Sequence, residues 1–89
     1  MNLPFNENIK DGFYIRTFSS DVLNENLKWH GDEEDRIVEC ENETDWEFQM
    51  DNNLPYKIPK NLPIFIPKGQ FHRLIKGTGD LTLKIKKIY

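Results

Sequence analysis

Apolar and polar side chains alternate along several short segments of this chain. Residues 46–50 read WEFQM, with an apolar side chain at every second position, and residues 81–86 read LTLKIK with the same alternation. Successive side chains of a β-strand point to opposite faces, so this period of two predicts strands with one buried and one exposed face. The segment RIVECE at 36–41 is expected to be a further strand, with Arg36 and Cys40 on the same face.

Turn-forming residues separate these segments at short intervals. Prolines stand at the expected strand boundaries, where a missing N–H is tolerated: Pro55, Pro59, Pro63 and Pro67. Asn61 is expected in a left-handed turn, and residues 77–80 (GTGD) are expected to form a hairpin connection. A single helical turn within residues 19–26 is the only helix that we expect. These features predict an all-β fold, a barrel or a sandwich, with little or no helix.

Composition narrows the class of protein further. With 89 residues the chain is expected to form one domain, residues 1–89, around one core. Its net charge of −3 argues against nucleic acid as a partner. The single cysteine excludes an internal disulfide and favours a reducing compartment. Without a signal peptide or an apolar stretch of about 20 residues, the chain is expected to be cytoplasmic and not to bind a membrane.

Two segments hold the two histidines of the chain, WHGDEEDR at 29–36 and PKGQFH at 67–72. The second segment matches the Pro-x-Gly-x-x-His core of the second cupin motif, and the first stands where the first cupin motif usually lies. From Leu27 to the C-terminus the chain therefore resembles the RmlC-like cupin superfamily. It is similar in particular to short single-domain cupins of marine bacteria and their phages, which have no assigned function. The resemblance implies a small cupin-type β-barrel, a jelly-roll-like antiparallel sandwich.

The resemblance also implies a metal site, which the sequence matches only in part. His30 and His72 occupy histidine positions of the two motifs, but Asp32 replaces a histidine and Arg36 replaces the usual glutamate ligand. If His30 and Asp32 share a strand face and His72 approaches them, the three form a facial triad suited to Fe, Mn, Ni or Zn. Alternatively, Arg36 pairs with Asp32 or Asp35 and fills the space of the metal. The sequence leaves a metal site and a metal-free network equally open.

Further residues near the motifs are candidates for ligand binding: Trp29, Asp35, Arg36, Cys40 and Phe48. Arg36 can bind a small carboxylate or phosphate ester, and Trp29 and Phe48 can form apolar walls. Asp35 is a spare oxygen donor or general base, whereas Glu33 and Glu34 are expected to be exposed. Cys40 is a candidate thiolate because it shares a face with Arg36, although an inert buried cysteine is the simpler interpretation.

Three kinds of function fit these residues. The first is a module that binds a small molecule, with or without a divalent metal. The second is a metal-dependent enzyme, an oxygenase, lyase or isomerase acting on a small polar substrate. The third is a scaffold that dimerises through an edge strand, either residues 12–18 or the C-terminal strand. We expect the binding module, as a homodimer, and leave open whether it is an enzyme.

Overall fold

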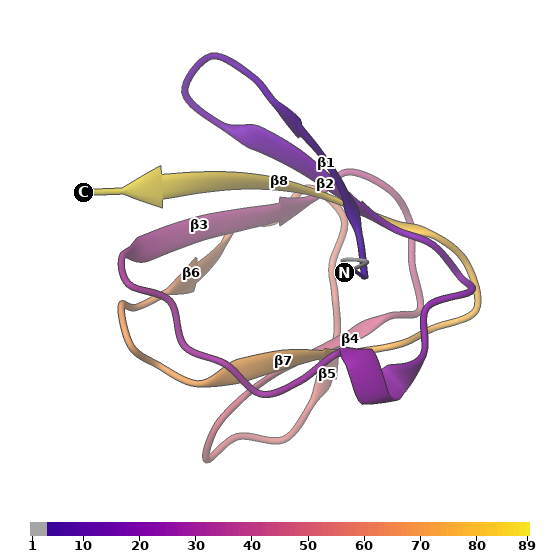
Figure 1. The fold of residues 1–89 in the computed structure, drawn as a ribbon. Coiled ribbons are helices and arrows are strands. Elements are labelled where there is room, and N and C mark those ends of the chain that lie inside the picture. The colour runs from indigo at the N-terminus through magenta and orange to yellow at the C-terminus, as the bar shows by residue number, and fades with distance from the viewer. Residues whose placement is uncertain (1–3) are drawn as a thin grey trace.

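The computed structural model describes residues 4–89 and consists almost entirely of antiparallel strands (Figure 1). A five-stranded sheet has the order β1-β2-β8-β3-β6, and a three-stranded sheet has the order β5-β4-β7. The element bounds are β1 Asn6–Ile9, β2 Tyr14–Phe18, η1 Asn24–Asn26, β3 Asp35–Cys40, β4 Glu47–Met50, β5 Tyr56–Lys57, β6 Ile64–Ile66, β7 His72–Ile75 and β8 Leu81–Ile88.

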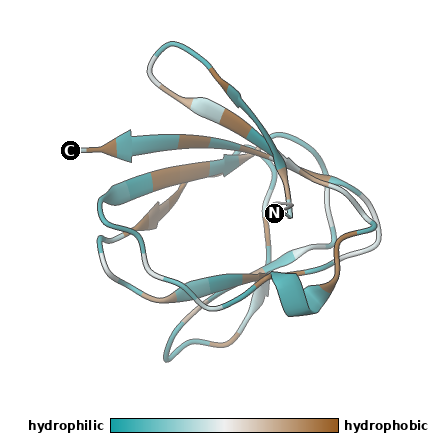
Figure 2. Ribbon diagram, in the orientation of Figure 1, coloured by the Kyte–Doolittle hydropathy of each residue, from teal (hydrophilic) through white to brown (hydrophobic). Residues whose placement is uncertain are grey.

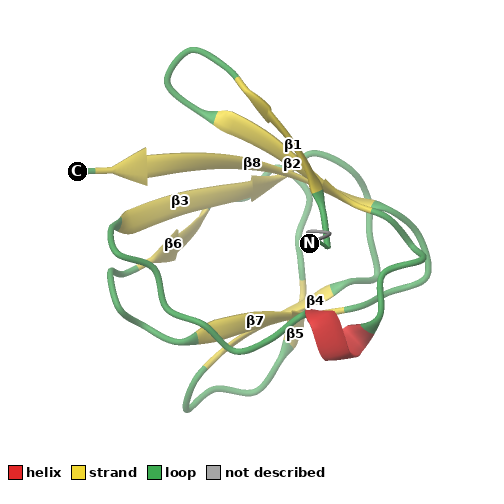
Figure 3. Cartoon of the chain, in the orientation of Figure 1, coloured by secondary structure: helices red, strands yellow, loops and turns green. Residues whose placement is uncertain are grey.

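The two sheets face each other as a sandwich (Figure 3). The all-β, jelly-roll-like sandwich expected from the sequence is confirmed, but its sheets are open and do not form a closed barrel. Within residues 4–89, no strand of the five-stranded sheet pairs with a strand of the three-stranded sheet. Residues 77–80 join β7 of one sheet to β8 of the other, so they form a crossover and not the expected hairpin.

The core lies between the sheets and follows the period of two seen in the sequence. Figure 2 shows hydrophobic residues alternating with hydrophilic ones along much of β8. Trp46 and Leu81 are completely buried. Trp46 also donates a hydrogen bond from Nε1 to the carbonyl oxygen of Gly79, at 2.7 Å, which ties the crossover to the core. The remaining core side chains are Phe18, Val22, Leu27, Val38, Cys40, Phe48, Ile58, Ile66, Leu83 and Ile85.

The edges of the large sheet differ from those expected for dimerisation. Strand β2 pairs with both β1 and β8, and β8 pairs with both β2 and β3. Residues 12–18 and the C-terminal strand are therefore interior, and their expected role as edge strands is wrong. The edge positions belong to β1 and β6. A homodimer stays a prediction.

Two local features, a left-handed turn and a single short helix, agree with what the sequence predicts. Asn61 has a φ of 61° and donates its backbone N–H to the carbonyl of Cys40, which confirms the left-handed turn. The 3₁₀ turn η1 is the only helix in the part of the chain that the structure covers. No helix there is long and apolar enough to cross a membrane.

Candidate metal and ligand site

The two cupin-like motifs meet through the backbones of their histidines. His30 N–H donates to His72 O at 3.1 Å, and His72 N–H donates to His30 O at 2.9 Å. A pair of residues that exchanges both hydrogen bonds places its side chains on the same face of the sheet. The two rings consequently lie 4.4 Å apart between centroids.

Asp32 reaches the histidines from a loop and not from the strand that we expected. Gly31 passes so close to the opposite turn that an added Cβ would lie 3.1 Å from Gly69 O. Gly69 N–H also donates to Asp32 O at 2.8 Å. Because this turn holds the loop down, the Asp32 side chain points inward and is only 6% exposed.

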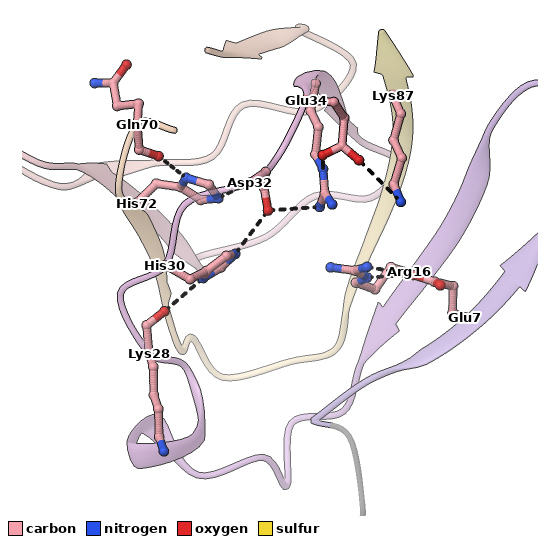
Figure 4. A network of polar contacts seen from close by, with 10 residues as sticks. Glu7, Arg16, Lys28, His30, Asp32, Glu34, Gln70, His72 and Lys87 are labelled. Carbon is pink, nitrogen blue, oxygen red and sulfur yellow. Dashed lines mark hydrogen bonds and ion pairs between the residues drawn. The ribbon is translucent and has the colours of Figure 1, made fainter. Parts of the chain in front are cut away.

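Each imidazole is oriented by a backbone carbonyl (Figure 4). His30 Nδ1 lies 3.0 Å from Lys28 O, and His72 Nδ1 lies 2.8 Å from Gln70 O. A carbonyl oxygen only accepts hydrogen bonds, so each Nδ1 atom carries a proton, and the Nε2 atom of a ring in its neutral form presents a lone pair. Metal-binding histidines in proteins are fixed by the same kind of contact.

The free nitrogen atoms converge on the carboxylate of Asp32. His30 Nε2 lies 3.8 Å from Oδ1, and His72 Nε2 lies 3.3 Å from Oδ2. Two ligand atoms that are each about 2.1 Å from one metal ion lie no more than about 4.2 Å apart. All ligand atoms of His30, Asp32 and His72 lie within 4.8 Å of one another, so these residues can hold a metal ion after a small side-chain movement.

Arg36 binds the same carboxylate on its other side. Its Nη1 lies 3.4 Å from Asp32 Oδ1, and its Nε lies 3.5 Å from Glu34 Oε2. Lys87 Nζ approaches Glu34 Oε1 at 3.4 Å, which extends the chain of charges to β8. The Glu34 side chain is 11% exposed, so its expected exposure is wrong. Two cations, from β3 and β8, hold it against the protein.

Burial and charge set the protonation of the site. Burial lowers the pKa of His72, and the neighbouring His30 and Arg36 lower it further, which outweighs the opposing effects of Gln70 and Asp32. His72 is therefore neutral near pH 7. Burial raises the pKa of Glu34, but the charges of Arg36 and Lys87 reverse this effect, and the net pKa is lowered.

A cavity of about 60 Å³ extends from this cluster into the core. The polar side chains that line it are Arg16, His30, Asp32, Arg36 and His72. The remaining walls are apolar. A wider pocket of about 380 Å³ shares the arginines, His30 and Asp32, and it is also bordered by Phe5 and Lys28. The cluster thus lies where an apolar interior meets an outer pocket.

Of the other candidate residues, Phe48 lines this cavity, whereas Trp29 and Asp35 do not. Phe48 lines it, with its ring centroid 5.8 Å from that of His72. The Arg73 guanidinium lies over the Trp29 ring, 4.7 Å from its centroid, and Trp29 is 39% exposed outside the cavity. Asp35 Oδ1 accepts a hydrogen bond from Lys68 N–H at 2.7 Å and does not line the cavity.

Cys40 points inward as its strand position predicted, but it does not line the cavity. It is 1% exposed and donates its S–H to Asn42 O at 3.1 Å. Burial raises the pKa of the Cys40 thiol. These properties match an inert structural cysteine.

Sequence reasoning missed Arg16, which lines both the cavity and the outer pocket. The available signal was its position in β2, two residues before the buried Phe18 and therefore on the inward face. The guanidinium of Arg16 is held by Glu7, with Nε and Nη2 at 2.8 and 2.7 Å from Oε2.

Comparison with known proteins identifies the fold. No protein-family model and no curated protein matches the sequence. Among solved structures, DMSP lyase DddQ from Ruegeria pomeroyi DSS-3 is similar over 85% of this chain, with 16% identity and a TM-score of 0.70. The Fe(II) form of HppE in complex with a substrate is similar over 99% of it, with 14% identity and a TM-score of 0.67.

A cupin domain from Bordetella pertussis Tohama I is similar over 100% of this chain and 99% of its own length, with 13% identity and a TM-score of 0.64. The chain spans only 37% of DddQ and 55% of HppE. Together these matches confirm that the chain has a cupin-like fold. The likeness to marine or phage cupins stays a prediction.

Proposed function

We propose that this protein binds a divalent metal ion through His30, Asp32 and His72, and that the ion takes part in binding a small molecule in the adjoining pocket. One observation carries this proposal: two imidazole lone pairs and a buried carboxylate oxygen converge without a donor between them. Asp32 Oδ2 has no hydrogen-bond partner within residues 4–89. Acceptors that converge in this way need a proton or a metal cation between them.

A metal-free network explains this convergence less well. It requires a proton on a histidine Nε2, but the pKa of His72 is lowered by burial and by neighbouring positive charge. Arg36 does not supply the missing donor to Oδ2, because its Nη1 approaches Oδ1. The two oxygens of Asp32 can therefore serve two cations, with the guanidinium on one and a metal ion on the other.

Three protein ligands leave coordination positions open toward the pocket. Two imidazoles and one carboxylate suit Fe(II), Mn(II), Ni(II) or Zn(II). A structural zinc site would be closed by a fourth protein ligand, whereas an open site accepts a water molecule or a ligand atom. This favours a site that binds a ligand over one that only stabilises the fold.

Metal content measured by elemental analysis tests the proposal. Untagged protein is incubated separately with each of the four ions and desalted, beside the His30→Ala/His72→Ala double variant. Asp32→Asn and the exposed Asp11→Asn form a matched pair that separates the role of this carboxylate from general charge. We expect close to one ion per chain in the wild type and in Asp11→Asn, and none in the other two. Metal retained equally by all four proteins, or by none, would refute it.

A metal-dependent enzyme is the second candidate, favoured by the open coordination positions beside a small and largely apolar pocket. A metal ion with open positions can polarise a carbonyl or lower the pKa of bound water. Two of the structural neighbours, DMSP lyase DddQ and HppE, have names or bound substrates that mark them as enzymes. Oxygen uptake by the Fe(II)-loaded protein in the presence of small polar substrates, absent in the double histidine variant, would favour an oxygenase over a binding module.

A further inference from the structure

Two connections between the sheets run side by side at the end of the sandwich that holds the candidate site (Figure 1). One consists of residues 31–34 and leads from the bridge between His30 and His72 into β3. The other consists of residues 67–71 and leads from β6 into β7, which begins at His72. Asp32 belongs to the first connection, and His72 follows the second. The relative position of these two side chains therefore depends on how the connections are held together.

Two consecutive backbone N–H groups of the second connection bind the first. Gly69 N–H donates to Asp32 O at 2.8 Å, and Lys68 N–H donates to Asp35 Oδ1 at 2.7 Å. Asp35 is the first residue of β3 and is paired with Ile88 of β8, so its backbone is anchored in the five-stranded sheet. The carboxylate of Asp35 thus ties the second connection to a fixed point of the fold.

The second connection also orients the His72 ring. Gln70 O lies 2.8 Å from His72 Nδ1, and Gln70 N–H donates to Pro67 O at 3.1 Å, which closes a turn over residues 67–70. Gly69 has a φ of 78°, a conformation that glycine adopts without strain. Because Lys68 lies inside this closed turn, a displacement of Lys68 also displaces Gln70 and the carbonyl group that holds the His72 ring.

We infer that Asp35 is a positioning residue of the candidate metal site: it fixes the 67–70 turn, and this turn sets the position of His72 relative to Asp32. Groups that orient metal ligands are commonly required for affinity although they do not touch the ion. This role differs from the spare oxygen donor or general base that the sequence suggested. The inference rests on the proposed function for the metal, but the orientation of His72 is measurable without one.

Competition for Zn(II) with a chromophoric chelator tests the inference. Asp35→Ala is expected to weaken Zn(II) binding by about tenfold, the lower end of the range for residues that orient metal ligands. Asp35→Asn keeps an oxygen that accepts from Lys68 N–H and is expected to retain most of the affinity. Asp80→Ala is the matched control, because Asp80 Oδ1 also accepts a backbone N–H, from Ser20, at 2.7 Å. Asp80 lines neither the cavity nor the outer pocket, so this variant should bind Zn(II) as the wild type does.

The three variants separate positioning from other roles of Asp35. Equal weakening by Asp35→Ala and Asp80→Ala would indicate a general loss of stability and would overturn the inference. Equal weakening by Asp35→Ala and Asp35→Asn would do the same, because the charge and not the hydrogen bond would then matter. Unchanged affinity in Asp35→Ala, or loss of its native circular dichroism spectrum while Asp80→Ala keeps it, would also overturn the inference.

Nitrogen NMR of the His72 imidazole in EDTA gives a second readout that needs no metal. At about pH 8, where the ring is neutral, its shifts report which nitrogen carries the proton. We expect the Nδ1–H form in the wild type and in Asp80→Ala, and a mixture with the Nε2–H form in Asp35→Ala. Unchanged shifts in Asp35→Ala would overturn the inference. A wild type that binds no Zn(II) but shows the expected difference would overturn the metal function alone.

Discussion

Replacing Asp32 by asparagine is expected to stabilise the metal-free protein, although the change removes a charge from the site. Asp32 Oδ2 is buried without a partner and lies 3.3 Å from His72 Nε2. At about pH 8 the His72 ring is neutral, because its pKa lies below the usual range, and it presents a lone pair to this oxygen. An asparagine amide keeps the shape of the side chain and can donate an N–H to His72 Nε2.

The size of the effect follows from three contributions. Relief of an unpaired buried acceptor contributes about 1–3 kcal/mol, and the new hydrogen bond contributes about 1 kcal/mol. Against this, the pair between Asp32 Oδ1 and Arg36 Nη1, at 3.4 Å, becomes a bond to a neutral acceptor, a loss of about 1–2 kcal/mol. The balance favours Asp32→Asn by about 1 kcal/mol, which corresponds to a rise in Tm of about 4–8 °C for a small domain.

Urea unfolding at about pH 8 in EDTA measures this difference, with the exposed Asp11→Asn as a control that should match the wild type. Metal at a hundredfold excess over its Kd adds about 2.7 kcal/mol to a protein that binds it. The order of the two free energies of unfolding is therefore expected to reverse when metal is added, because only the wild type gains this stability. A variant less stable than the wild type in EDTA would refute the reasoning. Asp32 would then already be satisfied by a protonated histidine or by Arg36, as in a metal-free network.

Three further predictions concern the rest of the fold. Trp46→Phe is expected to cost about 2–3 kcal/mol in urea unfolding, because it shrinks a fully buried side chain and leaves the Gly79 carbonyl without its donor. Asp45 accepts hydrogen bonds from the backbone N–H and the hydroxyl of Thr78, which lower its pKa. Its contribution to stability is expected above about pH 4 and is lost as the pH falls through the lowered pKa of the folded state, so the advantage over Asp45→Asn should shrink on acidification. Cys40 is expected to react with a thiol reagent only at the rate of unfolding, because it is buried and its pKa is raised; rapid labelling of the native protein would contradict this.

Local patterns in the sequence were sufficient to predict an all-β fold, but they left a barrel and a sandwich open. The alternation at 46–50 and 81–86 identifies two strands, and the φ of 61° at Asn61 follows from a residue type that tolerates it. The same local reasoning failed for residues 77–80, whose composition suits a hairpin. Whether such a turn closes a hairpin or crosses between sheets depends on which sheet each flanking strand joins, and that choice is made by pairing over long sequence distances.

The candidate site was likewise predicted only in part. The motifs predicted its possible metal ligands, but not the residues that strand pairing brings to it. The motifs placed His30, Asp32 and His72 together, and the structure brings these three side chains within reach of one ion. Spacing from Phe18 could have placed Arg16 on the inward face of β2, but its position in the same cavity as His30 depends on the pairing of β2 with β8, which brings it opposite Leu83. Glu34 lies in a run of acids that normally indicates a solvated loop. In the fold, Arg36 from β3 and Lys87 from β8 both approach Glu34, which is therefore largely buried. This contact between two strands cannot be read from the order of the residues.

Arg36 illustrates why replacement of a ligand by a cation does not by itself exclude a metal. A positive charge pointing into the coordination sphere would repel the ion, but Arg36 is held on Asp32 Oδ1 and toward Glu34. Its charge is thus partly balanced before any metal arrives. Asp32 is left with one oxygen for the ion, which enforces monodentate binding and keeps further coordination positions free. If the charge of Glu34 offsets that of Arg36 at the metal site, Glu34→Gln should weaken metal binding although Glu34 is not a ligand. Unchanged metal affinity in that variant would show that Arg36 needs no such balance.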